Sequence, residues 1–295
     1  MLAIIIPFFK LTFFEATLHS LANQTDKRFR VYIGDDASPE DCRTMLQKFE
    51  GKIDFTYHRF KTNLGATSLT QQWERCIILS NDEEWIMVLG DDDVLGDTVV
   101  SEFYKLSELE TRDVNLIRCN LNILKENDKI EKNCFDYEHH ELSNRFLDRI
   151  FSLKETITAS EFIFSRVLYL KKNGFIDFPL AWFSDYATWL SYSKESGIYN
   201  LLEAKVYWRL SDENISSKRD DVKTVELKIK SLFLFVSFLN ENFKIENRVL
   251  IPFAKTHLKN LLCATKFKAY SIILLKSFVA NPSLIKFKLF SSFIR

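Results

Sequence analysis

The sequence lacks the features that would place the protein in a membrane or direct it for export. No uninterrupted apolar run reaches the about 18 residues that a membrane-spanning helix requires, so we expect no membrane crossing. The apolar run over residues 2–9 is short and has no basic segment before it. The sequence therefore predicts no signal peptide.

The chain also contains little cysteine. Its five cysteines are odd in number, and they show no Cys-x-x-Cys spacing of the kind that zinc sites use. This pattern indicates a reducing compartment and no structural zinc, because disulfides persist only in oxidising surroundings. We therefore expect a cytoplasmic protein.

An excess of one charge is absent from the whole chain but present in its parts. The 40 basic residues balance 40 acidic ones, yet residues 252–295 hold seven lysines, one arginine and no acid. This gives +8 for the tail and leaves −8 for residues 1–251. Basic residues interleaved with phenylalanine can bind an anionic membrane face, each contributing about 1 kcal/mol. A helical pair with a solvated lysine face explains the tail as well, and the acidic body argues against a nucleic-acid partner.

Acidic residues follow two apolar runs that predict buried strands. An open α/β sheet holds its ligand at the carboxyl ends of its strands. Three adjacent aspartates repel one another unless a cation or another positive group neutralises them, although a solvated acidic turn is the plainer interpretation. The two runs cover residues 29–34 and 85–89, and the acids that follow are Asp35, Asp36, Asp91, Asp92 and Asp93.

Apolar and amphipathic segments alternate along the first 110 residues. The pattern predicts strands at residues 2–8, 30–34, 53–58 and 85–89, separated by helices at residues 12–23, 39–50 and 68–80. Thr12 and Glu15 form a possible capping box for the first helix, and Ser38 and Pro39 predict the start of the second. Such βα units imply an α/β fold with a mostly parallel sheet. We also expect a helix at 98–109, strands at 115–120 and 205–210, and a loop or hairpin at 126–140.

Taken together, these residues resemble the family 2 glycosyltransferases, which are inverting enzymes of the Rossmann-like GT-A fold. The resemblance covers residues 1–216. It rests on five segments: Ile4-Ile-Ile-Pro-Phe-Phe9, Ile33-Gly-Asp-Asp-Ala-Ser38, Asn63-Leu-Gly65, Gly90-Asp-Asp-Asp93 and the acceptor-side run from Phe178 to Trp189. A sixth segment, Arg209 to Ser216, resembles the part of the family that folds over the donor diphosphate.

The resemblance implies a role for each of these segments. Asp36 would bind the nucleoside, Asp92 with Asp93 would bind Mn²⁺ or Mg²⁺, and Asp185 would be the general base. The remaining donor-binding residues would be Pro7, Asp35, Asn63, Gly65, Asp91 and Arg209. The sequence departs from the family where Gly90 takes the place of the first aspartate of the D-x-D motif, and Ser184 the place of a glutamate. An aspartate at such a position also commonly caps a helix, and Arg209 could lie in an exposed polar loop.

The resemblance also implies a domain organisation and a function. We expect a GT-A domain over residues 1–216, with a nucleotide-sugar-binding half at 1–110 and an acceptor half at 111–216, and a basic helical extension at 217–295. The enzyme would move a sugar from a nucleotide-diphosphate donor, UDP above all, to a hydroxyl of a glycan or polyprenyl-linked acceptor. It would act in surface-polysaccharide assembly, such as O-antigen or capsule, at the inner face of the plasma membrane. The alternatives are a catalytically silent nucleotide-sugar-binding protein and a metal-dependent nucleotidyltransferase.

Overall fold

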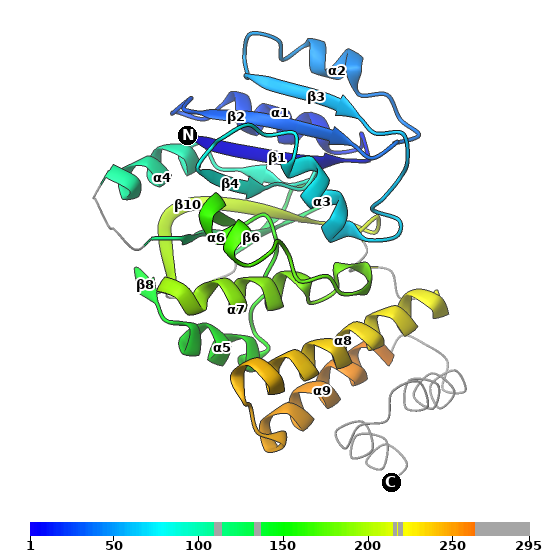
Figure 1. The fold of residues 1–295 in the computed structure, drawn as a ribbon. Coiled ribbons are helices and arrows are strands. Elements are labelled where there is room, and N and C mark those ends of the chain that lie inside the picture. Colours follow the sequence, from blue (N-terminus) through cyan, green and yellow to red (C-terminus); the bar gives the residue numbers. More distant parts are fainter. Residues whose placement is uncertain (109–113, 133–136, 215–216, 218–220, 263–295) are drawn as a thin grey trace. The chain divides into compact units, whose positions relative to one another are not determined.

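The computed structural model describes residues 1–108, 114–132, 137–214, 217 and 221–262 (Figure 1). The strands are β1 (Leu2–Phe8), β2 (Phe29–Asp35), β3 (Phe55–Arg59), β4 (Trp85–Val88), β5 (Val94–Leu95), β6 (Leu116–Lys125), β7 (Ile130–Lys132), β8 (His140–Glu141), β9 (Phe162–Ser165) and β10 (Ile198–Leu210). The helices are α1 (Phe14–Ala22), α2 (Arg43–Gln47), α3 (Leu69–Ile77), α4 (Val99–Glu108), α5 (Ser143–Ser152), α6 (Arg166–Lys171), the 3₁₀ turn η1 (Pro179–Ala181), α7 (Ser184–Ser196), α8 (Val222–Phe243) and α9 (Asn247–Leu262).

The strands form one mixed sheet with a parallel half. The strand order is β3-β2-β1-β4-β9-β6-β10-β5, and β3, β2, β1 and β4 are mutually parallel. Strand β9 runs antiparallel to both of its neighbours, β4 and β6, whereas β6 and β10 are parallel. Helices flank this sheet, as the sequence predicts for an α/β fold (Figure 1).

Strand β1 lies at the centre of the parallel half and is buried on both faces. Leu2, Ile4 and Ile6 belong to the same buried cluster as Phe14 of α1 and Phe103 of α4. The intervening residues of β1 are also inaccessible to solvent. A strand covered on both sides has no polar face, which explains its uninterrupted apolar run.

Two helix starts differ from the sequence prediction. Helix α1 begins at Phe14, and its N-cap residue Phe13 makes no side-chain capping hydrogen bond, while the capping box of Thr12 and Glu15 stays a prediction. Helix α2 begins at Arg43 instead of Pro39. The Ser38 hydroxyl accepts from the Glu40 amide at 3.0 Å, as a helix cap would, and donates to the Phe9 carbonyl oxygen at 2.6 Å, but the helix itself forms only from Arg43. The helix beginning after Ser68 is confirmed, since the Ser68 hydroxyl accepts from the Gln71 amide.

The chain divides into two compact units. Among the described residues, the first unit contains those of 1–176 and 188–211, and the second contains those of 177–187 and 212–262. The sheet belongs to the first unit, while η1, α8 and α9 belong to the second. The domain boundary expected at residue 216 stays a prediction.

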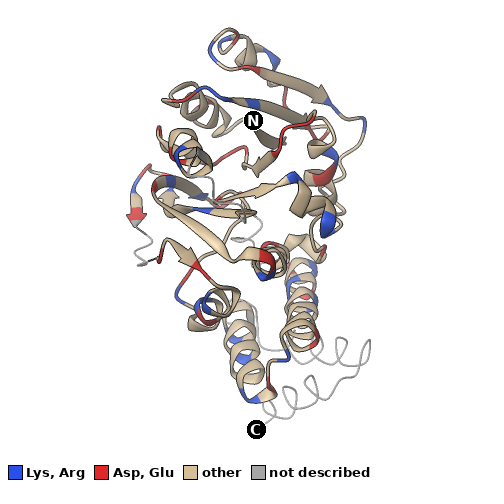
Figure 2. Ribbon diagram, turned by 60° about the vertical axis from the view of Figure 1, so that its left-hand side comes forward, with Lys and Arg blue, Asp and Glu red and all other residues tan. Residues whose placement is uncertain are grey.

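The C-terminal extension is helical as far as it is described. Helix α9 contains Arg248, Lys255 and Lys259 and no acidic residue, and Figure 2 shows basic residues along the long helices of the second unit. Residues 263–295, which carry most of the predicted basic tail, lie outside the described residues. Within the described part of the chain, no helix combines the length and the apolar character needed to span a membrane.

Candidate active site

The loop after β1 links two of the acidic strand ends. Pro7 lies on β1 opposite Gly34 of β2, and the Asp36 amide donates to the Phe8 carbonyl oxygen at 3.0 Å. On the other side, Asp91 Oδ2 accepts from the Phe9 amide at 2.7 Å. It also accepts from the next amide along the chain, at 2.8 Å. The carboxyl ends of β1, β2 and β4 therefore meet at one edge of the sheet, as the sequence predicts.

Asp35 is fully buried at the end of β2 and is held by three donors. Its carboxylate accepts from Tyr57 Oη and Arg59 Nη1, each at 2.6 Å, and from the Ser38 amide at 2.8 Å. Burial, together with the hydrogen bond to Asp35, raises the pKa of Tyr57 above its usual range. Asp35 thus joins the ends of β2 and β3.

Asp36 holds the loop that precedes α3. Its Oδ1 accepts from the Leu64 amide at 2.7 Å and its Oδ2 from the Gly65 amide at 2.9 Å, while Arg75 of α3 donates to Oδ1. The same loop is closed by Asn63, whose side-chain oxygen accepts from the amide of residue 66 at 2.8 Å. Asp36 is 4 % exposed, so its carboxylate is fixed before any ligand arrives.

The aspartate triplet is partly buried, and its charges repel one another. Burial, reinforced by the charge of Asp92, raises the pKa of Asp91 to about 7 and that of Asp93 to about 8. Ser160 donates to Asp93 Oδ2 and accepts from the Gly90 amide at 3.1 Å. Carboxylates under such mutual repulsion are typical of sites where a cation or a cationic side chain offsets the charge.

Gly90 leaves room for two of these carboxylates. A Cβ atom at position 90 would lie 2.8 Å from Asp93 Oδ2 and 3.0 Å from Asp92 Oδ1. Both oxygens therefore reach the space above the Gly90 backbone. A side chain at position 90 would therefore displace one or both of these carboxylates.

Arg209, at the end of β10, braces the triplet. Its amide donates to Asp93 Oδ1 at 2.9 Å, and its Nε donates to the Asp92 carbonyl oxygen at 3.0 Å. The guanidinium lies 4.1 Å from the centre of the Phe13 ring and donates to Asp128 Oδ1 at 3.1 Å. With 2 % of its surface exposed, Arg209 is a buried residue and not part of an exposed loop.

Asp185 lies in the second unit, in the first turn of α7. Its Oδ1 accepts from the Tyr186 amide at 2.9 Å, and a negative charge at a helix N-terminus is electrostatically favoured. The Ser184 hydroxyl accepts from the Phe178 amide at 2.9 Å and so closes the turn that leads into the helix. Helix α7 continues from here into the first unit.

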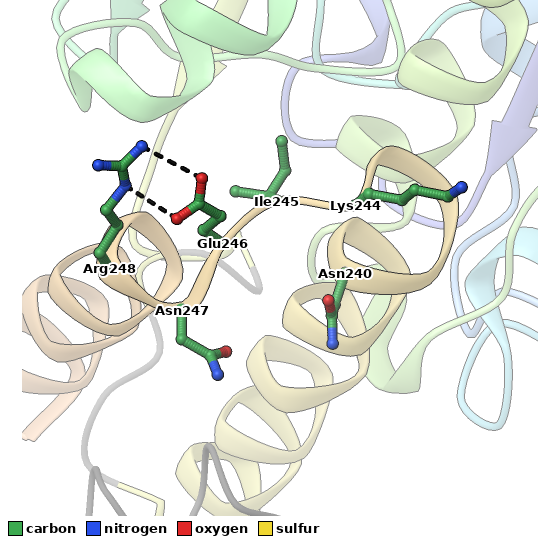
Figure 3. A pocket seen from close by; sticks show the side chains of 6 residues that line it. All are labelled: Asn240, Lys244, Ile245, Glu246, Asn247 and Arg248. Atoms are coloured by element: carbon green, nitrogen blue, oxygen red, sulfur yellow. Dashed lines mark hydrogen bonds and ion pairs between the residues drawn. The ribbon is translucent and has the colours of Figure 1, made fainter.

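Two hollows occur away from the predicted site residues. One, of about 490 Å³, lies at the connection between α8 and α9, where Arg248 pairs with Glu246 at 3.0 Å (Figure 3). The other, of about 370 Å³, lies beside α5 and is lined by charged residues such as Arg145 and Asp148. None of the predicted donor-binding, metal-binding or catalytic residues lines either hollow.

The structure brings most of the predicted donor residues into one connected set and adds residues that the sequence analysis missed. Pro7, Asp35, Asp36, Asn63, Gly65, Asp91, Asp92, Asp93 and Arg209 all belong to the first unit. The missed residues hold the aspartates in place: Tyr57, Arg59, Arg75 and Ser160. Arg59 ends strand β3, next to the expected strand at residues 53–58, and could have been found by that signal, whereas nothing in the sequence marks Ser160.

Comparison with known proteins gives one family and several similar structures. The family model described as Glycosyl transferase family 2 matches residues 3–172. A crystal structure of S. aureus TarS 1-349 in complex with UDP-GlcNAc has a TM-score of 0.72 at 16% sequence identity, and the match covers 96% of this chain and 82% of that one. A TarS 1-349 structure in complex with UDP has a TM-score of 0.64 at 16% identity, with the same coverage. No curated protein sequence matches this chain.

Proposed function

This chain belongs to glycosyl transferase family 2 and is a glycosyltransferase; we propose that it transfers a sugar from a UDP-sugar to a hydroxyl group, with inversion at the anomeric carbon. Its fold is the α/β GT-A fold that the sequence predicts. The UDP-GlcNAc and UDP held by the similar TarS structures support a UDP-sugar as the donor.

The observation that carries this proposal is the meeting of acidic strand ends at one edge of the sheet. Asp36 fixes the loop before α3, and Asp91 fixes the loop after β1. A rigid edge of this kind is where open α/β sheets bind nucleotides. In the proposal, Asp36 and the backbone around Gly65 meet the nucleoside, and Arg209 lies toward the diphosphate.

Two carboxylates of the triplet have donor atoms of the kind that a divalent cation takes. Asp92 Oδ1 and Asp93 Oδ2 face the same space above Gly90, and carboxylate oxygens are the ligands that Mg²⁺ and Mn²⁺ favour. Among the described residues no three acidic, histidine or cysteine side chains form a complete ligand set. An ion here would complete its shell with diphosphate oxygens and water, and would offset the charge of the departing UDP.

Inversion by direct displacement also needs a base on the acceptor side. We assign this role to Asp185, which would take the proton from the attacking hydroxyl. The acceptor that we propose is a glycan hydroxyl, free or carried on a polyprenyl lipid, in surface-polysaccharide assembly on the cytoplasmic side of the membrane.

The test of the donor proposal is release of UDP. We would incubate the protein with UDP-, GDP- and dTDP-sugars, with Mn²⁺ or with chelator, and compare wild type with Asp92→Ala and with Asp82→Ala, an exposed control. We expect metal-dependent release from a UDP-sugar and a loss of about 100-fold or more in Asp92→Ala alone. If no donor releases its nucleotide and UDP does not bind in the presence of Mn²⁺, the proposal fails.

Membrane docking is a separate proposal with its own measurement. The basic residues of 252–295 would hold the enzyme at an anionic surface, near a lipid-linked acceptor. Co-sedimentation with vesicles should therefore be stronger for anionic than for neutral lipid, and should weaken with salt. Equal binding to both vesicle types would contradict the electrostatic explanation.

A further inference from the structure

The segment from Phe178 to Phe183, here called the bent segment, has an unusual backbone. Three of its residues adopt positive φ angles: 60° at Leu180, 51° at Ala181 and 67° at Phe183. Residues with a Cβ atom rarely adopt such conformations, because the side chain then approaches the backbone too closely. Strained backbone of this kind persists only where the surroundings hold it in place.

One face of helix α8 supplies these surroundings. Lys228, Ser231 and Phe235 are spaced i, i+3 and i+7, so they lie on the same side of the helix. All three are completely buried. Each of them contacts a different residue of the bent segment.

The contact made by Ser231 is a hydrogen bond to the backbone. Its hydroxyl lies 2.8 Å from the Pro179 carbonyl oxygen and 3.0 Å from the Leu227 carbonyl oxygen of its own helix. The Pro179 carbonyl also accepts from the Trp182 amide at 3.2 Å. Ser231 thus fixes the first turn of the bent segment to α8.

The other two contacts hold aromatic rings. The rings of Phe235 and Phe183 stack with their centres 4.8 Å apart and their planes 6° apart. Lys228 Nζ lies 4.5 Å from the centre of the Trp182 ring, within the range of a cation–π contact. The strained residue Phe183 therefore has its side chain anchored on α8.

The bent segment leads directly into Ser184 and Asp185. The hydrogen bond from the Phe178 amide to the Ser184 hydroxyl ties the beginning of the segment to its end. The Ala187 amide donates to the Phe183 carbonyl oxygen at 3.0 Å, which joins the segment to the first turn of α7. The conformation of the bent segment therefore determines where the Asp185 carboxylate lies.

We propose that Lys228, Ser231 and Phe235 are positioning residues for the reaction: the α8 face holds the bent segment in its strained form and thereby fixes Asp185. This inference rests on the proposed function, in which Asp185 is the base. It gives the C-terminal extension a catalytic purpose that is independent of membrane binding. A catalytic group displaced by about 1 Å can cost about 100-fold in rate, so small contacts of this kind matter.

The first measurement is hydrogen–deuterium exchange in Ser231→Ala. The matched control is Ser237→Ala, which makes the same change at an exposed position of the same helix. Loss of one hydrogen bond should speed exchange at the amides of residues 178 and 180–183 by about fivefold, with no change in the control. Equal exchange in the two variants would overturn the proposal, whatever the catalytic results.

The second measurement is UDP release from UDP-GlcNAc with Mn²⁺, where water takes the place of the acceptor. We expect Ser231→Ala to lower kcat by about tenfold while the KM for UDP-GlcNAc changes less than twofold. A residue that only stabilises the fold would leave kcat per folded molecule unchanged. Wild-type kcat in folded Ser231→Ala would therefore overturn the positioning role.

A second pair of variants keeps the test independent of a single hydrogen bond. Phe235→Leu removes the ring that stacks on Phe183, and Phe243→Leu makes the same change at a half-buried position of the same helix whose ring contacts Phe238. Only Phe235→Leu should lower kcat and speed exchange in the bent segment. Equal effects in the two variants would count against a specific α8 face.

Asp185→Asn separates failure of this inference from failure of the proposed function. If Asp185→Asn releases UDP at the wild-type rate, Asp185 is not the base, and both the proposed mechanism and the catalytic part of this inference fail. If Asp185→Asn is impaired and Ser231→Ala behaves like Ser237→Ala, only the positioning role is overturned.

Discussion

Asp36 and Gly65 lie so close together that a Cβ atom at position 65 would stand 2.5 Å from Asp36 Oδ2. The Gly65 amide donates to the same oxygen at 2.9 Å. The glycine is therefore needed for close approach and not for an unusual φ angle. The pair joins the end of β2 to the loop before α3, where we propose that the nucleoside binds.

This relationship predicts the effect of Gly65→Ala. The methyl group would push the Asp36 carboxylate away from the loop amides, and overpacking of this kind costs about 1–3 kcal/mol of stability. We also expect UDP to bind at least about tenfold more weakly, measured by calorimetry. Ala66→Ser, which adds one atom at the exposed neighbouring position, is the control. Unchanged UDP affinity in Gly65→Ala would separate this loop from the nucleotide site.

A second prediction concerns Gly90, where the family motif has an aspartate. Gly90→Asp should not restore a better metal site, because the new side chain would meet Asp92 Oδ1 and Asp93 Oδ2 and add a further negative charge. We expect thermal unfolding to show a loss of about 1–3 kcal/mol, together with slower UDP release. Gly90→Ala makes the steric change alone, so a greater loss in Gly90→Asp would measure the added repulsion. Tighter Mn²⁺ binding by Gly90→Asp would contradict the prediction.

A third prediction concerns the guanidinium group of Arg209. Lysine cannot reproduce the donation to the Asp92 carbonyl and to Asp128 together with the contact over the Phe13 ring. Arg209→Lys should therefore cost about 1–3 kcal/mol in urea unfolding and slow UDP release. Arg43→Lys, the same change in an exposed ion pair with Asp41, should have no measurable effect on either. If Arg209→Lys and Arg43→Lys change stability and UDP release equally, Arg209 does not hold the aspartate triplet in place.

The fourth prediction is a pH dependence of stability in the second unit. Burial lowers the pKa of His257 from 6.5 to about 4, and its ring packs against Phe253 and Phe183 at 4.5 and 5.1 Å. Between these pKa values the unfolded chain binds a proton that the folded chain does not, so stability falls as the pH drops below 6.5. Going from pH 7 to pH 5, wild type should lose about 1–2 kcal/mol more than His257→Phe.

Urea unfolding at the two pH values would measure this difference. His58→Phe makes the same substitution at an exposed histidine and should follow the wild type. If His257→Phe loses as much stability as wild type on acidification, the buried histidine is not the source of the pH dependence.

Local sequence patterns predicted the parallel half of the sheet and the acids at its edge. Strand β1 was bounded correctly because its apolar run is continuous, and Ser68 marked the start of α3. The position of β9 between β4 and β6 could not be predicted, because that order depends on contacts between distant parts of the chain. The predicted start of α2 was wrong although Ser38 accepts from the Glu40 amide as a cap would, because such a local bond does not determine where the following residues become helical.

The site residues divide in the same way, into those that local sequence indicates and those that only distant contacts explain. Asp36 and the aspartate triplet follow apolar strands and could be found from the sequence, while their partners Arg75 and Ser160 come from other elements. The left-handed backbone of the bent segment was also not predicted, since Leu180, Ala181 and Phe183 are residues that seldom adopt it. The contacts that hold the bent segment come from α8, and the sequence of residues 178–189 alone does not reveal them.

The hydrogen bond between Ser231 and Pro179 joins residues that are 52 positions apart in the chain. During synthesis the bent segment therefore leaves the ribosome well before the helix that holds it, and must wait for α8 before it can take its final form. A message truncated after the sheet would yield a protein whose donor edge could assemble while the loop before Asp185 had no partner. We would expect such a product to bind nucleotide without turning it over, so the order of translation makes the arrival of α8 a requirement for catalytic competence that the donor edge does not share.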